Sequence, residues 1–403
     1  MKIRCIPVLA LALAACGGGD KGAAPARPVE IAAPAAPGST APNLATGPDG
    51  RVYLSWTEPR PDSAHALRYA LLQDGRWSEP RTVAEGRGWF VNWADFPSIL
   101  PLGDGGLAAH WLQKNGKEKY AYEVRLVRSR DEGRTWSPAV VPHRDGAAAE
   151  HGFVSLWAAG GDSVGVAWLD GRKYAGREEG DPAAETAVMS TLVGADGGMA
   201  PETPLDGRAC DCCQTAMTAT PDGPLVAYRD RTADEIRDIY FTRHAGGRWT
   251  EPRPVHADGW KIPACPVNGP ALSADGRRVV IAWFTAARDT ARVHVAFSDD
   301  AGATWSAPVR VDGGTPAGHA DVEIVDGGAL VSWIERTQGG PAEVRVRRVT
   351  RAGTLGEPRV LGGAPERSVP RMARDGDAVV FAWISPEKPS RVHTARMPLG
   401  DAR

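Results

Sequence analysis

Two eight-residue segments, SRDEGRTW at residues 129–136 and SDDAGATW at residues 298–305, follow the same pattern, S-x-D-x-G-x-T-W. In this pattern the aspartate can accept backbone N–H bonds across a turn, and the glycine can adopt a left-handed conformation that other residues avoid. The tryptophan can then pack beneath the turn. Shorter versions, DGRW at residues 74–77 and GGRW at residues 246–249, indicate that the turn recurs along the chain. Recurrence on this scale is typical of a fold assembled from copies of one unit.

An apolar strand that ends in an aromatic residue also recurs, in seven copies spaced 50 to 60 residues apart. The aromatic residues are Trp56, Trp111, Trp168, Tyr228, Trp283, Trp333 and Trp383. Each copy follows an earlier strand and a short Gly- or Asp-containing turn, which predicts a hairpin. A second hairpin, built around the S-x-D-x-G-x-T-W turn or a variant of it, follows most copies. The repeating unit is therefore four strands.

One four-stranded sheet cannot bury both of its faces, but sheets stacked radially around an axis can. We therefore predict an all-β fold, a β-propeller of four-stranded blades. Seven first hairpins occur but only six complete second hairpins, so seven blades are favoured and six are the alternative. The last unit lacks an outer strand, and residues 26–31, ARPVEI, resemble the fourth strands of other units. We predict that this N-terminal strand completes the last blade and closes the ring.

The composition excludes some classes of function. The 403 residues include 47 Lys and Arg against 49 Asp and Glu, for a formal net charge of −2. A chain with this balance has no basic field to attract nucleic acid. The hydrophobic fraction of 42% supports a folded core and argues against bulk disorder.

The N-terminus predicts export. Two basic residues precede an apolar stretch that is too short to span a bilayer and ends in LAAC at residues 13–16. This ending resembles a bacterial lipobox, which implies cleavage before Cys16 and lipid attachment to its thiol; an ordinary signal peptide is the alternative. Gly17 favours sorting to the outer membrane of the cell envelope. The chain therefore divides into a lipoprotein signal peptide (1–15), a lipidated flexible tether (16–25) and the propeller (26–403).

The S-x-D-x-G-x-T-W segments are similar to the Asp-box, or BNR repeat, of bacterial sialidases and related propellers. With the repeats, the resemblance covers nearly the whole mature chain. It implies the fold strongly and the activity weakly, because the box is a folding device on the face away from the usual site. A sialidase site implies three arginines that bind the substrate carboxylate, a Tyr–Glu pair that supplies the nucleophile and an Asp acid/base. The Arg-Ile-Pro start of such enzymes is absent here, and the nearest phrases are FPSI at 96–99 and VPR at 369–371.

Loops on one face of a propeller carry the candidate site. The loops that lead into the inner strands share this face with the loops that follow the second strands, and we expect the residues that open the inner strands to lie closest to the axis. The candidate ligand-binding residues are Arg172, Arg231, Arg336, Arg371 and Asn268. Tyr174 with Glu178 or Glu179 is the candidate nucleophile pair, and Asp95 is the candidate acid. The alternative interpretation is a solvated surface with local ion pairs, which contribute little stability.

Four cysteines of the mature chain, Cys210, Cys212, Cys213 and Cys265, lie in the same set of loops. They open two successive blades, so we expect their sulfurs to be neighbours near the axis. Disulfides that tie adjacent blades are the default in an oxidising compartment. The alternatives are a copper or zinc site to which His151 and His319 contribute imidazoles, and a redox-active dithiol.

These observations predict an envelope-anchored, sialidase-like propeller that recognises a sialic-acid-like or other acidic glycan. Exo-sialidase-type glycoside hydrolysis is an extension of this hypothesis. The alternatives are the thiolate metal or redox protein, and a non-enzymatic scaffold for another envelope protein. We expect a monomer that is held at the membrane by its lipid alone and has no nucleic-acid partner.

Overall fold

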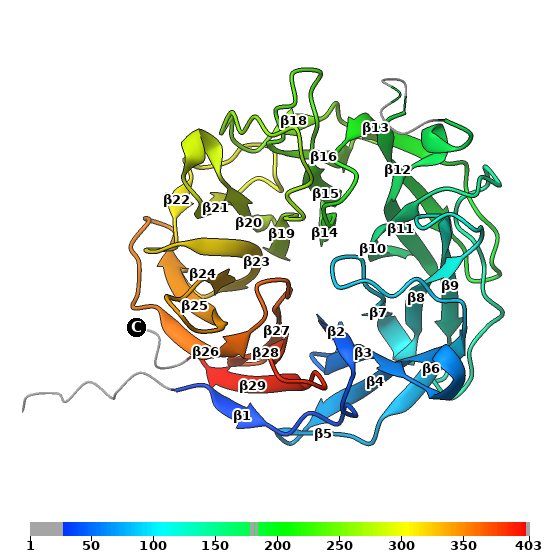
Figure 1. The fold of residues 1–403 in the computed structure, drawn as a ribbon, viewed down its shortest axis with the longest axis horizontal. Coiled ribbons are helices and arrows are strands. Elements are labelled where there is room, and N and C mark those ends of the chain that lie inside the picture. Colours follow the sequence, from blue (N-terminus) through cyan, green and yellow to red (C-terminus); the bar gives the residue numbers. More distant parts are fainter. Residues whose placement is uncertain (1–26, 178–180, 182–183, 400–403) are drawn as a thin grey trace, which may run out of the picture.

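The computed structural model describes residues 27–177, 181 and 184–399, and these form a ring of seven antiparallel sheets around one axis (Figure 1). The predicted all-β propeller with seven blades is confirmed, and the six-bladed alternative is wrong. Helices within the described residues are short 3₁₀ turns, such as η3 (Arg172–Tyr174). None of them is long and apolar enough to cross a membrane. The signal peptide, the tether and Cys16 lie outside the described residues.

Each blade runs from an inner strand at the axis to an outer strand at the rim. The first blade comprises β2 (Thr40–Thr46), β3 (Val52–Pro59), β4 (Ala64–Gln73), β5 (Arg76–Trp77) and β6 (Arg81–Arg87), and the second comprises β7 (Ser98–Pro101), β8 (Leu107–Lys114) and β9 (Tyr122–Ser129). The third blade comprises β10 (His151–Gly160), β11 (Ser163–Asp170), β12 (Thr186–Val193) and β13 (Thr203–Ala209). The fourth comprises β14 (Ala216–Thr220), β15 (Gly223–Arg229), β16 (Ile239–Ala245), β17 (Arg248–Trp249) and β18 (Arg253–Pro254). The fifth blade comprises β19 (Ala271–Asp275), β20 (Arg278–Thr285), β21 (Arg292–Ser298) and β22 (Val309–Arg310). The sixth comprises β23 (Pro316–Val325), β24 (Gly328–Glu335), β25 (Ala342–Thr350) and β26 (Arg359–Ala364). The seventh comprises β27 (Arg371–Asp375), β28 (Ala378–Ile384), β29 (Val392–Pro398) and β1 (Val29–Ile31). In the second blade, an isolated bridge from Leu126 to Val140 takes the outer position.

The last blade is completed by the N-terminal strand, as predicted. β1 pairs antiparallel with β29, so that Ile31 lies opposite Thr394 (Figure 1). The Thr394 hydroxyl donates to the Ile31 carbonyl at 2.7 Å and accepts the Trp77 indole N–H at 2.9 Å. Since Trp77 belongs to the first blade, this one hydroxyl links the two ends of the chain to the neighbouring blade.

The S-x-D-x-G-x-T-W segments form matching turns between the third and outer strands of their blades. The Thr135 N–H donates to Asp131 Oδ1 at 2.9 Å, and the Gly133 N–H donates to Ser129 Oγ at 2.8 Å. The hydrogen bonds from Thr135 hold the pKa of Asp131 at about 2. Gly133 has φ of 78°, and a Cβ there would collide with the hydroxyl of Tyr69 in the preceding blade. The glycine is therefore required both for the turn and for close contact between blades.

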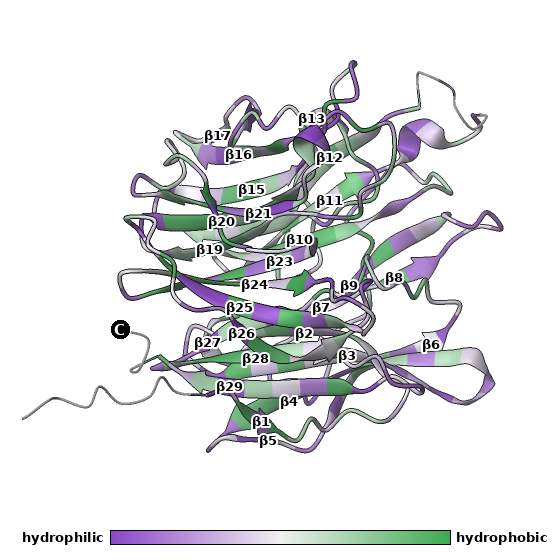
Figure 2. Cartoon of the chain, turned by 60° about the vertical axis from the view of Figure 1, so that its left-hand side comes forward, coloured by the Kyte–Doolittle hydropathy of each residue, from purple (hydrophilic) through white to green (hydrophobic). Residues whose placement is uncertain are grey.

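Aromatic residues at the ends of the second strands form the core between blades. Trp56, Trp168 and Trp333 are at most 1% exposed. Each indole N–H donates to a carboxylate two residues later, as Trp168 does to Asp170 at 2.8 Å. In Figure 2 the apolar stretches run along strands such as β15, β20 and β28. These tryptophans therefore pack in the core.

The ring closure can be tested by removing the N-terminal strand. We expect deletion of residues 27–31 to lower the melting temperature by about 5–10 °C, because it exposes the edge of β29 and removes a buried isoleucine. Calorimetry of this variant is compared with a deletion of residues 17–24 as control. An unchanged melting temperature for the first deletion would contradict the closure.

Candidate functional site

A cavity of about 270 Å³ lies where the inner strands of the blades converge. All seven blades contribute to its wall. The lining residues that carry polar groups include Asn43, Asp95, Ser98, Ser155, Gln214, Thr215, Asp321 and Arg371. Small-molecule sites are typically concave and present a few convergent polar groups in this way. The sequence-based expectation that residues opening the inner strands lie closest to the axis is thus met by the cavity wall.

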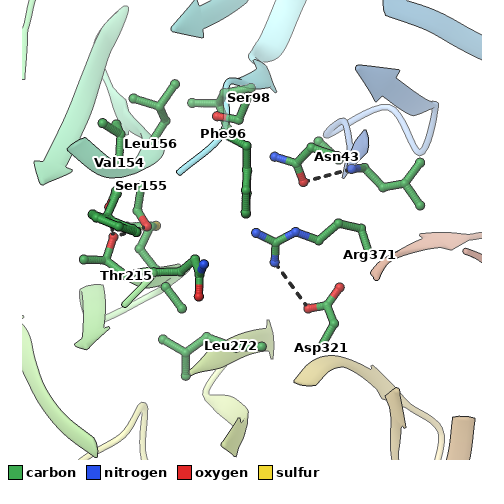
Figure 3. A pocket seen from close by; sticks show the side chains of 18 of the residues that line it. Asn43, Phe96, Ser98, Val154, Ser155, Leu156, Thr215, Leu272, Asp321 and Arg371 are labelled. Carbon is green, nitrogen blue, oxygen red and sulfur yellow. Dashed lines mark hydrogen bonds and ion pairs between the residues drawn. The ribbon is translucent and has the colours of Figure 1, made fainter. Parts of the chain in front are cut away.

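Arg371 projects its guanidinium into the cavity (Figure 3). Its charged end lies 4.7 Å from the centre of the Phe96 ring, and its Nη1 lies 3.9 Å from Asp321 Oδ1. Its Nε is buried and has no hydrogen-bond partner among the described residues. Asp321 instead accepts the backbone N–H of Met372 at 2.6 Å. Arg371 therefore keeps donor capacity for a molecule in the cavity.

Asp95 lines the cavity and belongs to a hydrogen-bonded trio with Tyr122 and Glu150, which lie behind it. Its Oδ1 accepts the Phe153 N–H at 2.7 Å, and its Oδ2 lies 2.7 Å from the hydroxyl of Tyr122. The same hydroxyl lies 2.7 Å from Glu150 Oε1. Burial raises the pKa of Asp95 to about 7 and that of Glu150 to about 8. Because one phenol can donate only one proton, the second contact requires a protonated carboxyl group.

Tyr122 and Glu150 are functional candidates that the sequence analysis missed. Tyr122 is fully buried and stacks on Phe90 with ring centres 3.9 Å apart, so in the sequence it is indistinguishable from a core aromatic residue. Glu150 precedes His151, at the opening of an inner strand. The position rule that selected Asp95 could therefore have found Glu150.

Three of the four predicted arginines are engaged outside the cavity. Arg172 donates to Asp170 at 2.6 Å and lies 2.9 Å from Glu202. Arg231 pairs with Glu235 at 2.7 Å, and Arg336 pairs with Glu366 at 3.0 Å. Of the predicted set, the cavity wall contains Arg371 alone. The structure therefore does not bring the four arginines together.

The predicted nucleophile pair is also not assembled at the cavity. Tyr174 lies in η3, half-buried, and is not one of the lining residues. Burial, followed by the negative charge of Asp211, raises the pKa of Tyr174. Its proposed partners Glu178 and Glu179 lie outside the described residues.

Asn268 ties blades together instead of presenting its amide to a ligand, which corrects the sequence-based assignment. Its Oδ1 accepts the His319 N–H at 2.6 Å. Its Nδ2 donates to the carbonyls of Pro266 at 3.1 Å and Ala317 at 3.3 Å. With both ends of the amide occupied, Asn268 joins the openings of the fifth and sixth blades.

The four predicted cysteines do come together. The sulfurs of Cys210, Cys212 and Cys213 lie within 4.8 Å of one another, and the Cys265 sulfur lies within 4.8 Å of that of Cys212. In the described part of the chain, neither close group of potential metal ligands around these sulfurs includes a histidine.

The two predicted imidazole ligands have other partners. His151 stacks on His143 with ring centres 3.7 Å apart, and its Nε2 lies 3.0 Å from Asp145. His319 packs edge-on against Trp93, and burial lowers its pKa to about 4. The prediction that these two histidines join the cysteines is wrong, because each ring is fixed in a separate packing environment.

Several solved structures are similar to this chain. A protein of unknown function from Dyadobacter fermentans has a TM-score of 0.52 at 14% identity, over 92% of this chain and 98% of that chain. The GH93 α-L-arabinofuranosidase of Fusarium graminearum, in complex with arabinobiose, has a TM-score of 0.52 at 12% identity, over 93% and 98%. The NanB sialidase from Streptococcus pneumoniae has a TM-score of 0.45 at 12% identity, over 90% and 68%. No protein-family model and no curated protein matches the sequence. The first two likenesses show that the propeller fold is shared.

The buried trio predicts a pH dependence of stability. The folded-state pKa of Glu150, about 8, exceeds its ordinary value of 4.5, so its contribution is complete below pH 4.5 and is lost as the pH rises through 8. We expect Glu150→Gln to reduce the fall in melting temperature between those pH values by about 2–5 °C. Exposed Glu251→Gln is the control. Parallel curves for wild type and Glu150→Gln would disprove the assignment.

Proposed function

We propose that the protein recognises a carbohydrate in the central cavity. The observation that carries this proposal is Arg371, whose guanidinium enters a polar cavity with an unpartnered Nε. A buried donor without a partner is costly, and a ligand that accepts from it recovers that free energy. The flat face of Phe96 beside the guanidinium adds an apolar surface for the C–H groups of a sugar ring.

The remaining wall suits hydroxyl groups. Ser155 and Thr215 carry hydroxyl groups that can donate and accept hydrogen bonds, and these two already contact each other at 2.7 Å (Figure 3). The GH93 α-L-arabinofuranosidase that shares the fold over 93% of this chain is described with arabinobiose bound. That likeness supports a sugar as the ligand class.

We propose further that the sugar carries an acidic group. A guanidinium donates two parallel hydrogen bonds to a carboxylate, which a neutral sugar cannot match. The carboxyl group of Asp95, whose burial raises its pKa to about 7, is partly protonated near neutral pH and so repels an anion less than its formal charge suggests. Sialic-acid-like sugars and uronic acids belong to this class. In this proposal the ligand is met at the cell envelope, where the predicted lipid on Cys16 holds the protein.

Glycoside hydrolysis is the second candidate, and one observation favours it. Asp95 lies in the cavity wall with a pKa close to neutrality, the condition for a residue that donates a proton to a leaving group. Its hydrogen bond with Tyr122 and the further contact of Tyr122 with Glu150 offer a route by which that proton is replaced.

Binding is tested by isothermal titration of N-acetylneuraminic acid, galacturonic acid and L-arabinose. We expect the acidic sugars to bind more tightly than arabinose, and Arg371→Lys to weaken them about 10-fold or more, because an ammonium lacks the two-pronged donor. Arg336→Lys is the matched control, since Arg336 pairs with Glu366 outside the cavity. Equal affinity of the Arg371→Lys variant would remove this residue from the site.

Hydrolysis is tested with umbelliferyl sialoside and nitrophenyl α-L-arabinofuranoside. If either is cleaved, we expect Asp95→Asn to lower kcat about 100- to 10,000-fold, because the amide cannot donate an acidic proton. Tyr174→Phe should retain turnover, since Tyr174 does not line the cavity. The opposite pattern would return the catalytic role to Tyr174. Absence of turnover in the wild type would leave recognition without catalysis.

A further inference from the structure

Four sulfur atoms meet where the fourth and fifth blades begin. Cys210, Cys212 and Cys213 lie in the turn between β13 and β14, and Cys265 lies in the loop between β18 and β19. The Cys210 sulfur is 3.7 Å from that of Cys212 and 3.6 Å from that of Cys213. One short turn therefore places three sulfurs close together, and the loop before the fifth blade places the Cys265 sulfur next to that of Cys212.

The spacing of the Cys210, Cys212 and Cys213 sulfurs fits metal coordination, and the Cys265 sulfur lies within 4.8 Å of that of Cys212. A disulfide bond has a length of about 2.05 Å, much shorter than either distance. Zinc–sulfur bonds of about 2.3 Å place neighbouring sulfurs about 3.8 Å apart in a tetrahedral site. The distances of 3.6 and 3.7 Å from Cys210 lie near this edge length.

A buried arginine, Arg229, lies next to the cysteine turn, and its positive charge would be stabilised by a nearby negative charge. Arg229 is 1% exposed, and its guanidinium donates to the backbone carbonyls of Asn268, Arg237 and Phe284. Within the described residues it forms no ion pair with a carboxylate. The guanidinium also lies over the Trp260 ring, 4.9 Å from its centre, so all of these partners are uncharged. A buried cation with uncharged partners is costly unless an anion lies close by. Thiolates in the adjoining turn, where the Cys210 N–H donates to the Arg229 carbonyl at 3.0 Å, would supply that charge.

Neighbouring donors also favour thiolate at the inner sulfurs. Arg237 Nη1 donates to the Cys210 sulfur at 3.1 Å, and the Asn268 N–H donates to the Cys213 sulfur at 3.3 Å. Donors of this kind orient the ligands of a metal and tune their affinity.

The cluster is open on one side. Cys210 and Cys213 are buried, whereas Cys212 is half-buried and Cys265 is exposed. Cys265 Sγ lies 3.1 Å from Asp211 Oδ1, and both lie close to Cys212. An ion can therefore enter past Cys265 and Cys212 and reach the two inner sulfurs.

We propose that Cys210, Cys212 and Cys213 bind one thiophilic cation, Cu⁺ or Zn²⁺, as thiolates, with Cys265 as the fourth ligand of a four-coordinate ion. Soft thiolates select these ions over harder cations. Each thiol that binds the ion releases its proton to solvent, so affinity falls as the pH is lowered. The ligands are sulfur atoms alone, without the imidazoles that the sequence suggested. This metal-site proposal stands whether or not a carbohydrate binds in the cavity.

The proposal is tested by anaerobic titration of the reduced, metal-free protein with Zn²⁺ and with Cu⁺, each against a chromogenic competitor. We expect one ion per chain, and a thiolate-to-metal charge-transfer band when Co²⁺ replaces Zn²⁺. Cys210→Ser and Cys213→Ser should each weaken binding about 100-fold or more, and Arg237→Gln about 10-fold, because the last changes only a neighbour of a ligand. Circular dichroism confirms that each variant is folded.

Exposed Cys265→Ser provides a variant whose folding is not at risk, and it distinguishes the two ions. Weaker Zn²⁺ binding in this variant supports a four-thiolate zinc site, and unchanged Cu⁺ binding supports a three-thiolate copper site. The Cys210/Cys212/Cys213 triple serine variant should bind neither ion at one equivalent. Unchanged binding by that variant would overturn the proposal. So would non-reducing mass spectrometry of protein isolated from cells that shows these cysteines joined in disulfides.

Discussion

Every blade of this propeller needs a neighbour on each face, and the three-residue pairing of β1 with β29 is what gives the last blade its outer strand. An open fan of sheets would leave the first and last sheets with an apolar face in water. The hydroxyl of Thr394, shared between Ile31 and Trp77, joins the chain ends and the first blade at one point. Closure therefore rests on a local contact between segments at opposite ends of the sequence.

The functional geometry follows from closure, because a closed ring forces the first residues of all the inner strands toward one axis. Asn43 from the first blade and Arg371 from the last line the same cavity. The carboxyl groups of Asp95 and Asp321 also lie in this wall. Burial raises the pKa of Asp95 to about 7 and raises the pKa of Asp321 as well. Because Asp95 is partly protonated near neutral pH, the cavity that holds the Arg371 guanidinium is less negative than its composition suggests, and this suits an anionic ligand.

The fold was predictable from sequence because it is periodic. The repeat spacing and the turn chemistry indicated a propeller of seven four-stranded blades. The missing outer strand of the last unit indicated that the N-terminal strand completes the ring. Asp95 and Arg371 were found by the rule that residues opening inner strands approach the axis. The rule does not cover Arg172, which follows a second strand, and nothing local indicates that Glu202, just before β13 of the same blade, is its partner. Tyr122 was missed because a buried tyrosine in an apolar strand shows its hydrogen-bond partners only after the chain has folded.

The sulfur cluster and the cavity are built on one stretch of chain. Gln214 follows Cys213 directly, and its amide donates to the Ala94 carbonyl at 2.6 Å and accepts the Gly269 N–H at 3.1 Å. It thus spans the second and fifth blades across the wall of the cavity. A cation held by the preceding cysteines would fix the backbone of Gln214 and Thr215, both of which line the cavity. Coupling between two binding sites is reciprocal. If the cation strengthens sugar binding by ordering this wall, a bound sugar strengthens cation binding by the same factor.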